Sequence, residues 1–206
     1  MLMIGFGMTA YPAVSDSVQI GKGKQIIEEI QNTWERINLD VQRERAEQYN
    51  NRLNTDPKNI SLDTYYNILD TEDGIMGYLS IPAIQTELPI YHGVSDEVLR
   101  KGVGHIPGTA FPVGGEGNHS VLAGHTGLPS AELFSNLTEL DLGDVFQIGV
   151  LGDRITYKVD QIKIVEPEEI QDILPVEGED YCTLVTCTPY GINSHRLLVR
   201  GKRVKT

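Results

Sequence analysis

Hydrophobic positions in the first quarter of the chain follow a helical period. Between about Val18 and Leu53, apolar residues recur three or four positions apart. They are Ile26, Ile30, Trp34, Ile37 and Val41. Residues at these spacings share one face of an α-helix, so the segment predicts a single amphipathic helix. The apolar stripe lasts too few heptads for a coiled coil, and we expect it to pack on the domain.

After Asp73 and Gly74 the pattern changes to short apolar runs separated by Gly, Pro and Asn. The predicted strands are Met76–Ile81, Leu88–Tyr91, Ser120–Ala123, Asp144–Ile148, Arg154–Asp160, Lys163–Val165, Cys182–Cys187 and Arg196–Val204. Two short helices are expected near Ser95–Gly102 and Ser130–Leu137. Closely spaced strands with few helices predict a mainly β fold, a barrel. A length of 206 residues suits one such domain with an appended element.

The segment between these two patterns is polar. Proline disfavours helix for the residue before it, so Asp56-Pro57 should end the helix, and Ser61 to Asp73 is expected to be loop. At the other end, residues 1–15 are uncharged, but Gly and Pro interrupt them and they are too few to span a bilayer. No basic segment precedes them, as a signal peptide would require. We interpret them as the remnant of an N-terminal membrane anchor, with an ordinary apolar terminus as the alternative.

The predicted organisation therefore has four parts. Residues 1–15 are the anchor remnant, 16–53 a helical extension, 54–73 a loop, and 74–206 the barrel.

The charge balance limits the partners. There are 29 acidic and 17 basic residues, which give a net charge of −12. Binding to nucleic acid needs clustered Lys and Arg, so nucleic acid is not expected as a partner. The acidity serves solubility or favours a partner that presents lysine amines.

The two cysteines, Cys182 and Cys187, are five positions apart. Strand side chains alternate between faces, so an odd offset points the two thiols in opposite directions and disfavours a disulfide. The five histidines are scattered and no second cysteine pair has ligand spacing, so no metal site is predicted. Free cysteine is often buried, and Cys182 is expected to be a small core residue.

The chemistry is expected around Cys187. This thiol ends the apolar run Thr183-Leu184-Val185-Thr186-Cys187, a turn with Pro189 and Gly191 follows, and Arg196 opens the next apolar run. Strand, loop and strand would bring Cys187 and Arg196 side by side at one end of a sheet.

His125 lies upstream between Gly124 and Gly127, where compliant backbone near a strand end favours a reactive group. A nucleophile, a proton carrier and an anion stabiliser suffice for acyl transfer through a thioester, with no cofactor. The remaining candidates have structural interpretations. His92, His105 and His119 are expected to serve structure, His195 to face away from Arg196, and Arg200 to be a surface charge.

These residues also carry a resemblance. The TLVTC segment, the arginine nine positions after its cysteine and the upstream LAGH resemble the sortases, cysteine transpeptidases of the Gram-positive cell surface. The segment TCTPYGINSHRLLVRG is most similar to class C, the pilin-polymerising branch, and the resemblance extends from about Tyr11 to Lys202. It implies an eight-stranded barrel and an enzyme tethered at the extracellular face of the membrane.

The resemblance also implies the reaction. The enzyme would cleave an LPxTG-type signal between Thr and Gly, with Cys187 forming the thioester, His125 moving protons and Arg196 stabilising the oxyanion. A lysine amine of the next pilin subunit would then resolve the thioester. The alternatives are a housekeeping sortase that anchors proteins to peptidoglycan, a plain cysteine hydrolase, and a surface-binding barrel without activity.

Class C relatives carry a lid, an Asp-Pro-aromatic loop over the catalytic cleft. Asp56 and Pro57 match its first two positions, whereas Lys58 departs from the aromatic third. Tyr65 or Tyr66 could replace the aromatic anchor. The alternative interpretation of Asp56-Pro57 is a simple turn.

Overall fold

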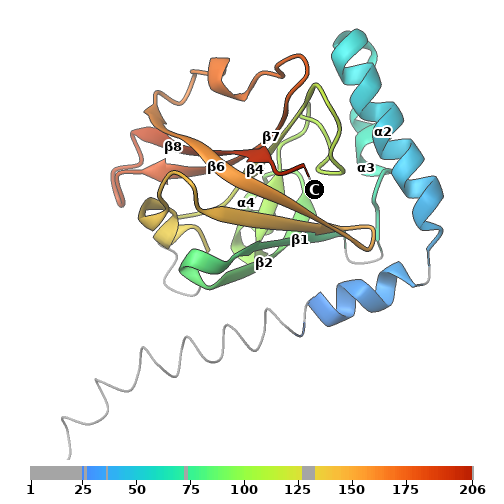
Figure 1. Ribbon diagram of the computed structural model, residues 1–206, viewed down its shortest axis with the longest axis horizontal. Helices are drawn as coiled ribbons and strands as arrows, with labels where there is room; N and C mark the ends of the chain where they lie inside the picture. The colour runs from blue at the N-terminus through green and yellow to red at the C-terminus, as the bar shows by residue number, and fades with distance from the viewer. Residues whose placement is uncertain (1–24, 26, 36, 72–73, 127–132, 206) are drawn as a thin grey trace, which may run out of the picture.

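The computed structural model describes residues 25, 27–35, 37–71, 74–126 and 133–205. Within this part of the chain, eight strands form a closed barrel in the order β1-β2-β3-β4-β7-β8-β6-β5 (Figure 1). The strands are β1 (Ile75–Ile81), β2 (Thr86–His92), β3 (Val103–His105), β4 (Asn118–Ala123), β5 (Val145–Val150), β6 (Asp153–Val165), β7 (Asp180–Thr188) and β8 (His195–Arg203). The predicted eight-stranded, mainly β fold is confirmed.

Two neighbouring pairs in the barrel, β2 with β3 and β4 with β7, are parallel, and the other neighbours are antiparallel. The parallel pairing of β4 and β7 brings the C-terminal ends of both strands to one end of the barrel. The β7–β8 turn marks that end, at the left of Figure 1.

Two details of the strand prediction were wrong, although the predicted number of strands agrees with the structure because one strand was missed and another was predicted as two. The three-residue strand β3 was missed. The two segments predicted on either side of Gln161 are one strand, β6, because a bulge between Val159 and Gln161 lets the chain stay paired with β8.

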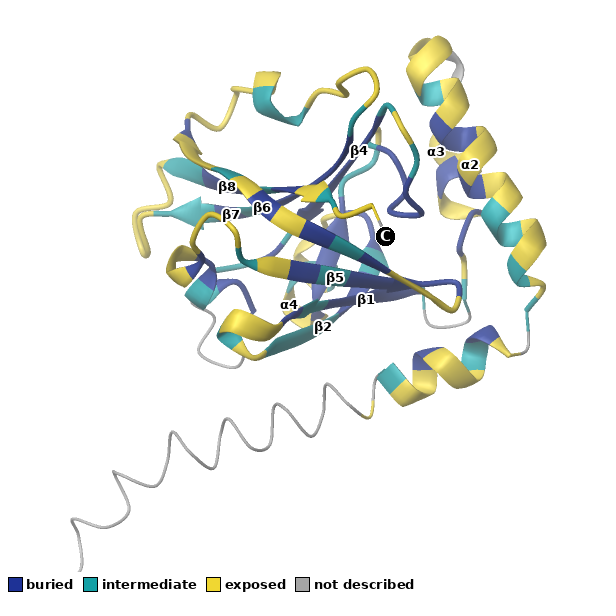
Figure 2. Cartoon of the chain, in the orientation of Figure 1, coloured by how far each residue is buried: buried dark blue, intermediate teal, exposed yellow. Residues whose placement is uncertain are grey.

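Large side chains form the core, and the dark blue segments of Figure 2 mark the buried residues on the strands and on the loops between them. Phe111, Phe134, Phe146 and Tyr157 are all fully buried, and the rings of Phe146 and Tyr157 stack at 5.5 Å between centroids. These aromatic residues supply much of the apolar area that stabilises the fold.

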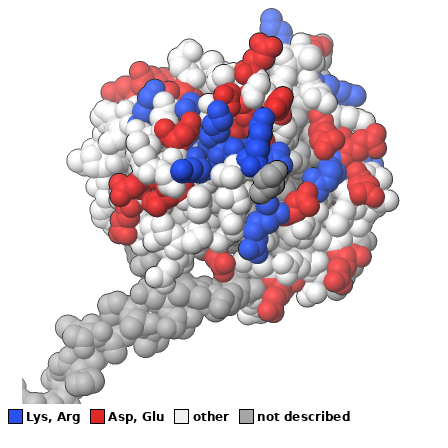
Figure 3. Space-filling view, in the orientation of Figure 1, with Lys and Arg blue, Asp and Glu red and all other residues white. Residues whose placement is uncertain are grey.

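Basic and acidic side chains are interleaved on the face shown in Figure 3. Strand β8 supplies basic residues that pair with acidic ones: Arg200 lies 2.9 Å from Asp160, and Lys202 lies 2.6 Å from Glu179. These residues neutralise one another locally, and such pairs contribute little to stability where they are exposed.

The N-terminal extension contains two helical segments, so the single helix predicted from Val18 to Leu53 was wrong. Residues 27–34 are helical, and α2 (Leu39–Thr55) begins after a break. The reason is Asn38, whose side chain accepts a hydrogen bond from Val41 N at 3.1 Å and caps a new helix. The predicted packing is confirmed for Ile30 and Trp34, which are buried against Tyr78, whereas Val41 is 39% exposed. Ile26 lies outside the described residues.

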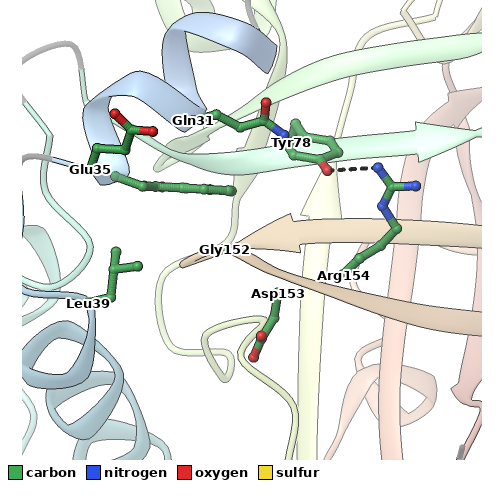
Figure 4. A pocket seen from close by; sticks show the side chains of 8 residues that line it. Gln31, Glu35, Leu39, Tyr78, Gly152, Asp153 and Arg154 are labelled. Atoms are coloured by element: carbon green, nitrogen blue, oxygen red, sulfur yellow. Dashed lines mark hydrogen bonds between the residues drawn. The ribbon is translucent and has the colours of Figure 1, made fainter.

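A cavity of about 300 Å³ lies between the 27–34 helix, the start of α2 and the β5–β6 turn (Figure 4). Trp34 stacks on Tyr78 at 6.2 Å, and Arg154 donates to the Tyr78 hydroxyl at 3.4 Å. Arg154 is near the start of β6, about 35 Å of strand away from Val165, the residue that pairs with Arg196. The cavity therefore belongs to the packing of the extension and lies away from the Cys187 end.

The stretch from Ser61 to Asp73, predicted as loop, contains the helix α3 (Leu62–Tyr66). Ser61 caps it by accepting a hydrogen bond from Thr64 N at 3.1 Å. Tyr65 is 1% exposed, and its hydroxyl accepts from Gly93 N at 3.0 Å. Burial of this one aromatic side chain in the barrel wall gives a polar segment a reason to fold as a helix.

The predicted helix near Ser95–Gly102 is confirmed as α4 (Asp96–Lys101). The second, near Ser130–Leu137, lies partly outside the described residues, and the described part forms the 3₁₀ helix η3 (Ser135–Glu139). Three further 3₁₀ turns are η1 (Pro57–Asn59), η2 (Pro82–Ile84) and η4 (Gln171–Ile173).

The proposed anchor remnant, residues 1–15, lies outside the described part of the chain. Among the helices that are described, none is long and apolar enough to cross a bilayer.

His105 links α3 to the barrel from a completely buried position. Its Nε2 lies 2.9 Å from the carbonyl oxygen of Ala110, and its Nδ1 lies 3.1 Å from the hydroxyl of Tyr65. Burial lowers the pKa of His105 to about 4. The neutral ring is therefore favoured in the folded protein.

This burial predicts a pH dependence of stability. Because the folded pKa is below the unfolded value of 6.5, the contribution of His105 is complete above pH 6.5 and is lost as the pH falls toward 4. Between pH 7 and pH 4.5 we expect the free energy of unfolding, measured with urea, to fall by about 2 kcal/mol through this residue.

The variant His105→Gln isolates this contribution, because other buried groups such as Asp180 remain in both proteins. Its free energy of unfolding should decrease less over the same pH range. An equal decrease in both proteins would show that His105 does not cause the dependence.

Candidate active site

Cys187 and Arg196 are directly opposite each other in the antiparallel pair of β7 and β8. Side chains in such positions lie on one face with Cβ atoms about 5 Å apart. Both residues are partly exposed, next to the turn that joins the strands. The predicted arrangement of strand, loop and strand, with the thiol beside the arginine, is therefore present.

His125 follows β4, the neighbour of β7 on its other side. Ala123 pairs with Val185, and Gly124 N continues the pairing by donating to Val185 O at 3.0 Å. His125 is the second residue after Ala123, and the next residue, Thr126, donates to Cys187 O at 3.1 Å, so the His125 segment lies against the end of β7. The structure thus gathers the ends of β4 and β7 and the start of β8 around one partly exposed thiol.

The backbone at His125 is also fixed from the opposite side. Phe134 N donates to His125 O at 3.1 Å, and the Phe134 ring covers the preceding residue. A Cβ at Gly124 would lie 2.7 Å from that ring. Glycine is therefore required at position 124 for Phe134 and the His125 segment to approach this closely.

Two threonines, which the sequence analysis did not single out, join the His125 and Cys187 segments. Thr186 Oγ1 donates to Gly124 O at 2.7 Å, and Thr126 Oγ1 donates to Cys187 O at 3.1 Å. The hydroxyls of Thr126 and Thr186 also bond to each other. The available signal was that one threonine directly follows His125 and the other directly precedes Cys187.

The β7–β8 turn holds the Arg196 guanidinium. Its Nη1 donates to Asn193 O at 3.2 Å and to His195 O at 3.0 Å. Asn193 adopts a left-handed conformation with φ of 59°, which asparagine tolerates better than most residues. His195 Nε2 lies 3.2 Å from Glu166 Oε1, a contact that agrees with its predicted orientation away from Arg196.

The two thiols have different environments. Cys182 is completely buried, and this burial raises the pKa of its thiol. Cys187 is partly exposed, and both cysteines are free. Because the thiolate is the reactive form, Cys187 is the candidate nucleophile, and the prediction of Cys182 as a core residue is confirmed.

Three other histidines are structural, as predicted. His92, His105 and His119 are buried, and burial lowers the pKa of each. His119 illustrates the role, because its ring bonds to Leu174 O at 3.0 Å and to Thr183 Oγ1 at 2.7 Å.

Arg200, predicted to be a surface charge, is paired with Asp160 and lies 4.2 Å above the Tyr181 ring. Within the described residues, no group of three or more His, Cys, Asp or Glu side chains could hold a metal ion.

The structure does not bring Asp56, Pro57 and Lys58 to Cys187. They are exposed at the C-terminal end of α2, on the right in Figure 1, whereas the β7–β8 turn is on the left. The nearby Asn54 donates to Asn118 Oδ1 at 3.3 Å, and Asn118 opens β4. From there to the level of His125 the strand direction covers about 20 Å.

Solved structures with the same fold come from sortases. Sortase C of Streptococcus pneumoniae is 43% identical, with a TM-score of 0.80 over 88% of this chain and 97% of that one. Sortase C1 of Streptococcus agalactiae is 42% identical, with a TM-score of 0.83 over 88% of this chain and 99% of that one.

Similarity in sequence agrees with these structures. Sortase D of Bacillus subtilis is 33% identical over 131 residues, and the match covers 62% of this chain and 63% of that protein. The family model of the sortase domain matches residues 79–204, more than half of the chain. On these matches, the protein belongs to the sortase family.

Proposed function

We propose that this protein is a class C cysteine transpeptidase that joins pilin subunits through lysine isopeptide bonds. The observation that carries the proposal is the pairing of Cys187 with Arg196 beside the strand end that bears His125. The structure of sortase C from Streptococcus pneumoniae, a protein described with a pilin substrate, supports pilin as the substrate class.

In the first half-reaction the Cys187 thiolate attacks the threonine carbonyl of an LPxTG-type signal. Arg196 donates hydrogen bonds to the oxygen that becomes negative in the tetrahedral intermediate. The bond between threonine and glycine breaks, and His125 as imidazolium gives its proton to the leaving amine. The product is a thioester between Cys187 Sγ and the threonine carbonyl.

In the second half-reaction a lysine amine of another pilin subunit attacks the thioester. His125, now neutral, takes a proton from this amine, and the Cys187 thiolate leaves. An isopeptide bond replaces the thioester, and the enzyme returns to its starting state. The residues themselves supply nucleophile, acid, base and oxyanion stabilisation. We expect this reaction at the extracellular face of the Gram-positive membrane, with the enzyme tethered through its N-terminal segment.

Purified pilin that carries both a sorting signal and an acceptor lysine tests the proposal. We expect covalent multimers on denaturing gels, and mass spectrometry should identify the isopeptide bond. The variant Cys187→Ala should form neither the acyl-enzyme adduct nor multimers. The buried cysteine offers a matched control, since Cys182→Ala should retain both reactions. An adduct that persists in Cys187→Ala would overturn the nucleophile assignment.

The same assay separates the alternatives. Transfer only to a small peptidoglycan amine would indicate a housekeeping sortase. Release of the free acid with every amine would indicate a hydrolase. A surface-binding barrel without activity would keep its function after alkylation of Cys187.

The lid hypothesis has its own test. If Asp56 guards the cleft, Asp56→Ala should speed alkylation of Cys187 and hydrolysis of a sorting-signal peptide. Because the Asp56 loop follows α2, on the other side of Figure 1 from the β7–β8 turn, we expect both rates to stay within a factor of two of wild type. Glu47→Ala, an exposed position on α2, serves as the control. A clear acceleration in Asp56→Ala alone would establish a lid that reaches the cleft.

A further inference from the structure

The regular pairing of β4 with β7 ends just before the residues that matter for the proposed chemistry. Its last pair joins Ala123 and Val185, and Gly124 N adds one more main-chain bond at 3.0 Å. His125 and Cys187 follow this point. Their relative position therefore depends on what holds the two chains together beyond the strand ends.

Side-chain hydroxyls provide that link. In a parallel ladder the next steps would use main-chain N–H groups to reach Gly124 O and Cys187 O. In this protein Thr186 Oγ1 donates to Gly124 O at 2.7 Å, and Thr126 Oγ1 donates to Cys187 O at 3.1 Å. The two hydroxyls thus take the place of main-chain donors and connect the His125 segment to the end of β7.

The number of hydroxyl protons decides which of the two threonines donates to the other. Each threonine hydroxyl has one proton, and the proton of Thr186 is directed to Gly124 O. In its contact with Thr126, the Thr186 oxygen then acts as the acceptor. The single Thr126 proton is then shared between two acceptors of β7, Thr186 Oγ1 and Cys187 O, and Thr126 makes both contacts from the position directly after His125.

We propose that Thr126 is a positioning residue, which fixes the His125 backbone relative to Cys187 through its hydroxyl. The proposal rests on the function given above, because it assumes that His125 transfers protons to and from the substrate that Cys187 attacks. Thr126 itself does not take part in bond making. Gly124 N before His125 and Thr126 Oγ1 after it bind the segment to β7 on both sides.

The expected effect is on rate more than on substrate binding. A misplacement of about 1 Å between reacting groups can reduce a rate about 100-fold. Thr126→Val keeps the shape of the side chain and removes the hydroxyl, and we expect kcat to fall at least about tenfold with KM little changed. Thr126→Ser restores a hydroxyl and should recover most of the activity.

A control must remove similar bonds elsewhere. Thr71 Oγ1 donates to Ile75 O at 2.8 Å and accepts from Ile75 N at 3.0 Å, near the start of β1. Thr71→Val should therefore lower the free energy of unfolding about as much as Thr126→Val, while kcat stays at the wild-type level. Equal losses of kcat in the two valine variants would reduce Thr126 to a stability role and overturn the proposal.

A second readout needs no transpeptidation. The rate of Cys187 alkylation by iodoacetamide is measured against pH in wild type, Thr126→Val and His125→Ala. If Thr126 holds His125 near the thiol, the profile of Thr126→Val should change in the direction of His125→Ala. A wild-type profile in Thr126→Val would contradict the inference even if the protein proved to have another activity. A changed profile without pilin multimers in wild type would contradict only the proposed function.

Discussion

The parallel pairing of β4 with β7 is the constraint on which the site depends. Parallel strands place their C-terminal ends at the same edge of a sheet, and a long connection must return the chain between them. Here that connection contains β5 and β6, and it carries the chain back so that Asn118 pairs with Asp180 and Ala123 with Val185. An antiparallel pair would leave His125 and Cys187 at opposite ends. Strand direction therefore brings the segments of two residues that are 62 positions apart to the same end of the barrel.

Beyond the strand ends, side chains and turns, and no longer main-chain pairing, fix the positions of the site residues. The hydroxyls of Thr126 and Thr186 hold the His125 segment, and the left-handed turn at Asn193 presents a carbonyl to Arg196. Reactive groups are commonly found on such irregular segments, supported by a rigid scaffold. The barrel supplies the rigidity, since its aromatic interior fixes the strands from which both segments leave.

The sequence predicts those elements whose pattern of apolar and polar residues matches their burial in the folded protein. Long alternating or apolar runs such as β7 and β8 were located within one or two residues, and with them the pairing of Cys187 and Arg196. The strand β3 was missed because its three residues are too few to show a period, and its pairing with β2 and β4 joins separate segments of the chain. Helix α3 was missed because its stability depends on the burial of Tyr65 against His105 and Phe111, contacts that join distant segments. The threonine link was missed because no spacing rule connects hydroxyls on different strands.

The position of the N-terminal extension follows from contacts that sequence similarity does not reveal. The buried amide of Asn50 donates to Phe111 O at 3.0 Å and accepts from Phe111 N at 2.7 Å, so α2 is fixed where the chain approaches the start of β4. A buried amide with both its bonds made is costly to displace. Asp56 follows only six residues later, and the exposed Lys58 offers no aromatic surface that could hold the loop over a distant cleft. The Asp-Pro pair thus resembles that of class C relatives, whereas a lysine stands at the third position in place of an aromatic residue. Among the described residues, the neighbours of Cys187 are the β7–β8 turn and the segment after β4, at the end of the barrel opposite to Asn118.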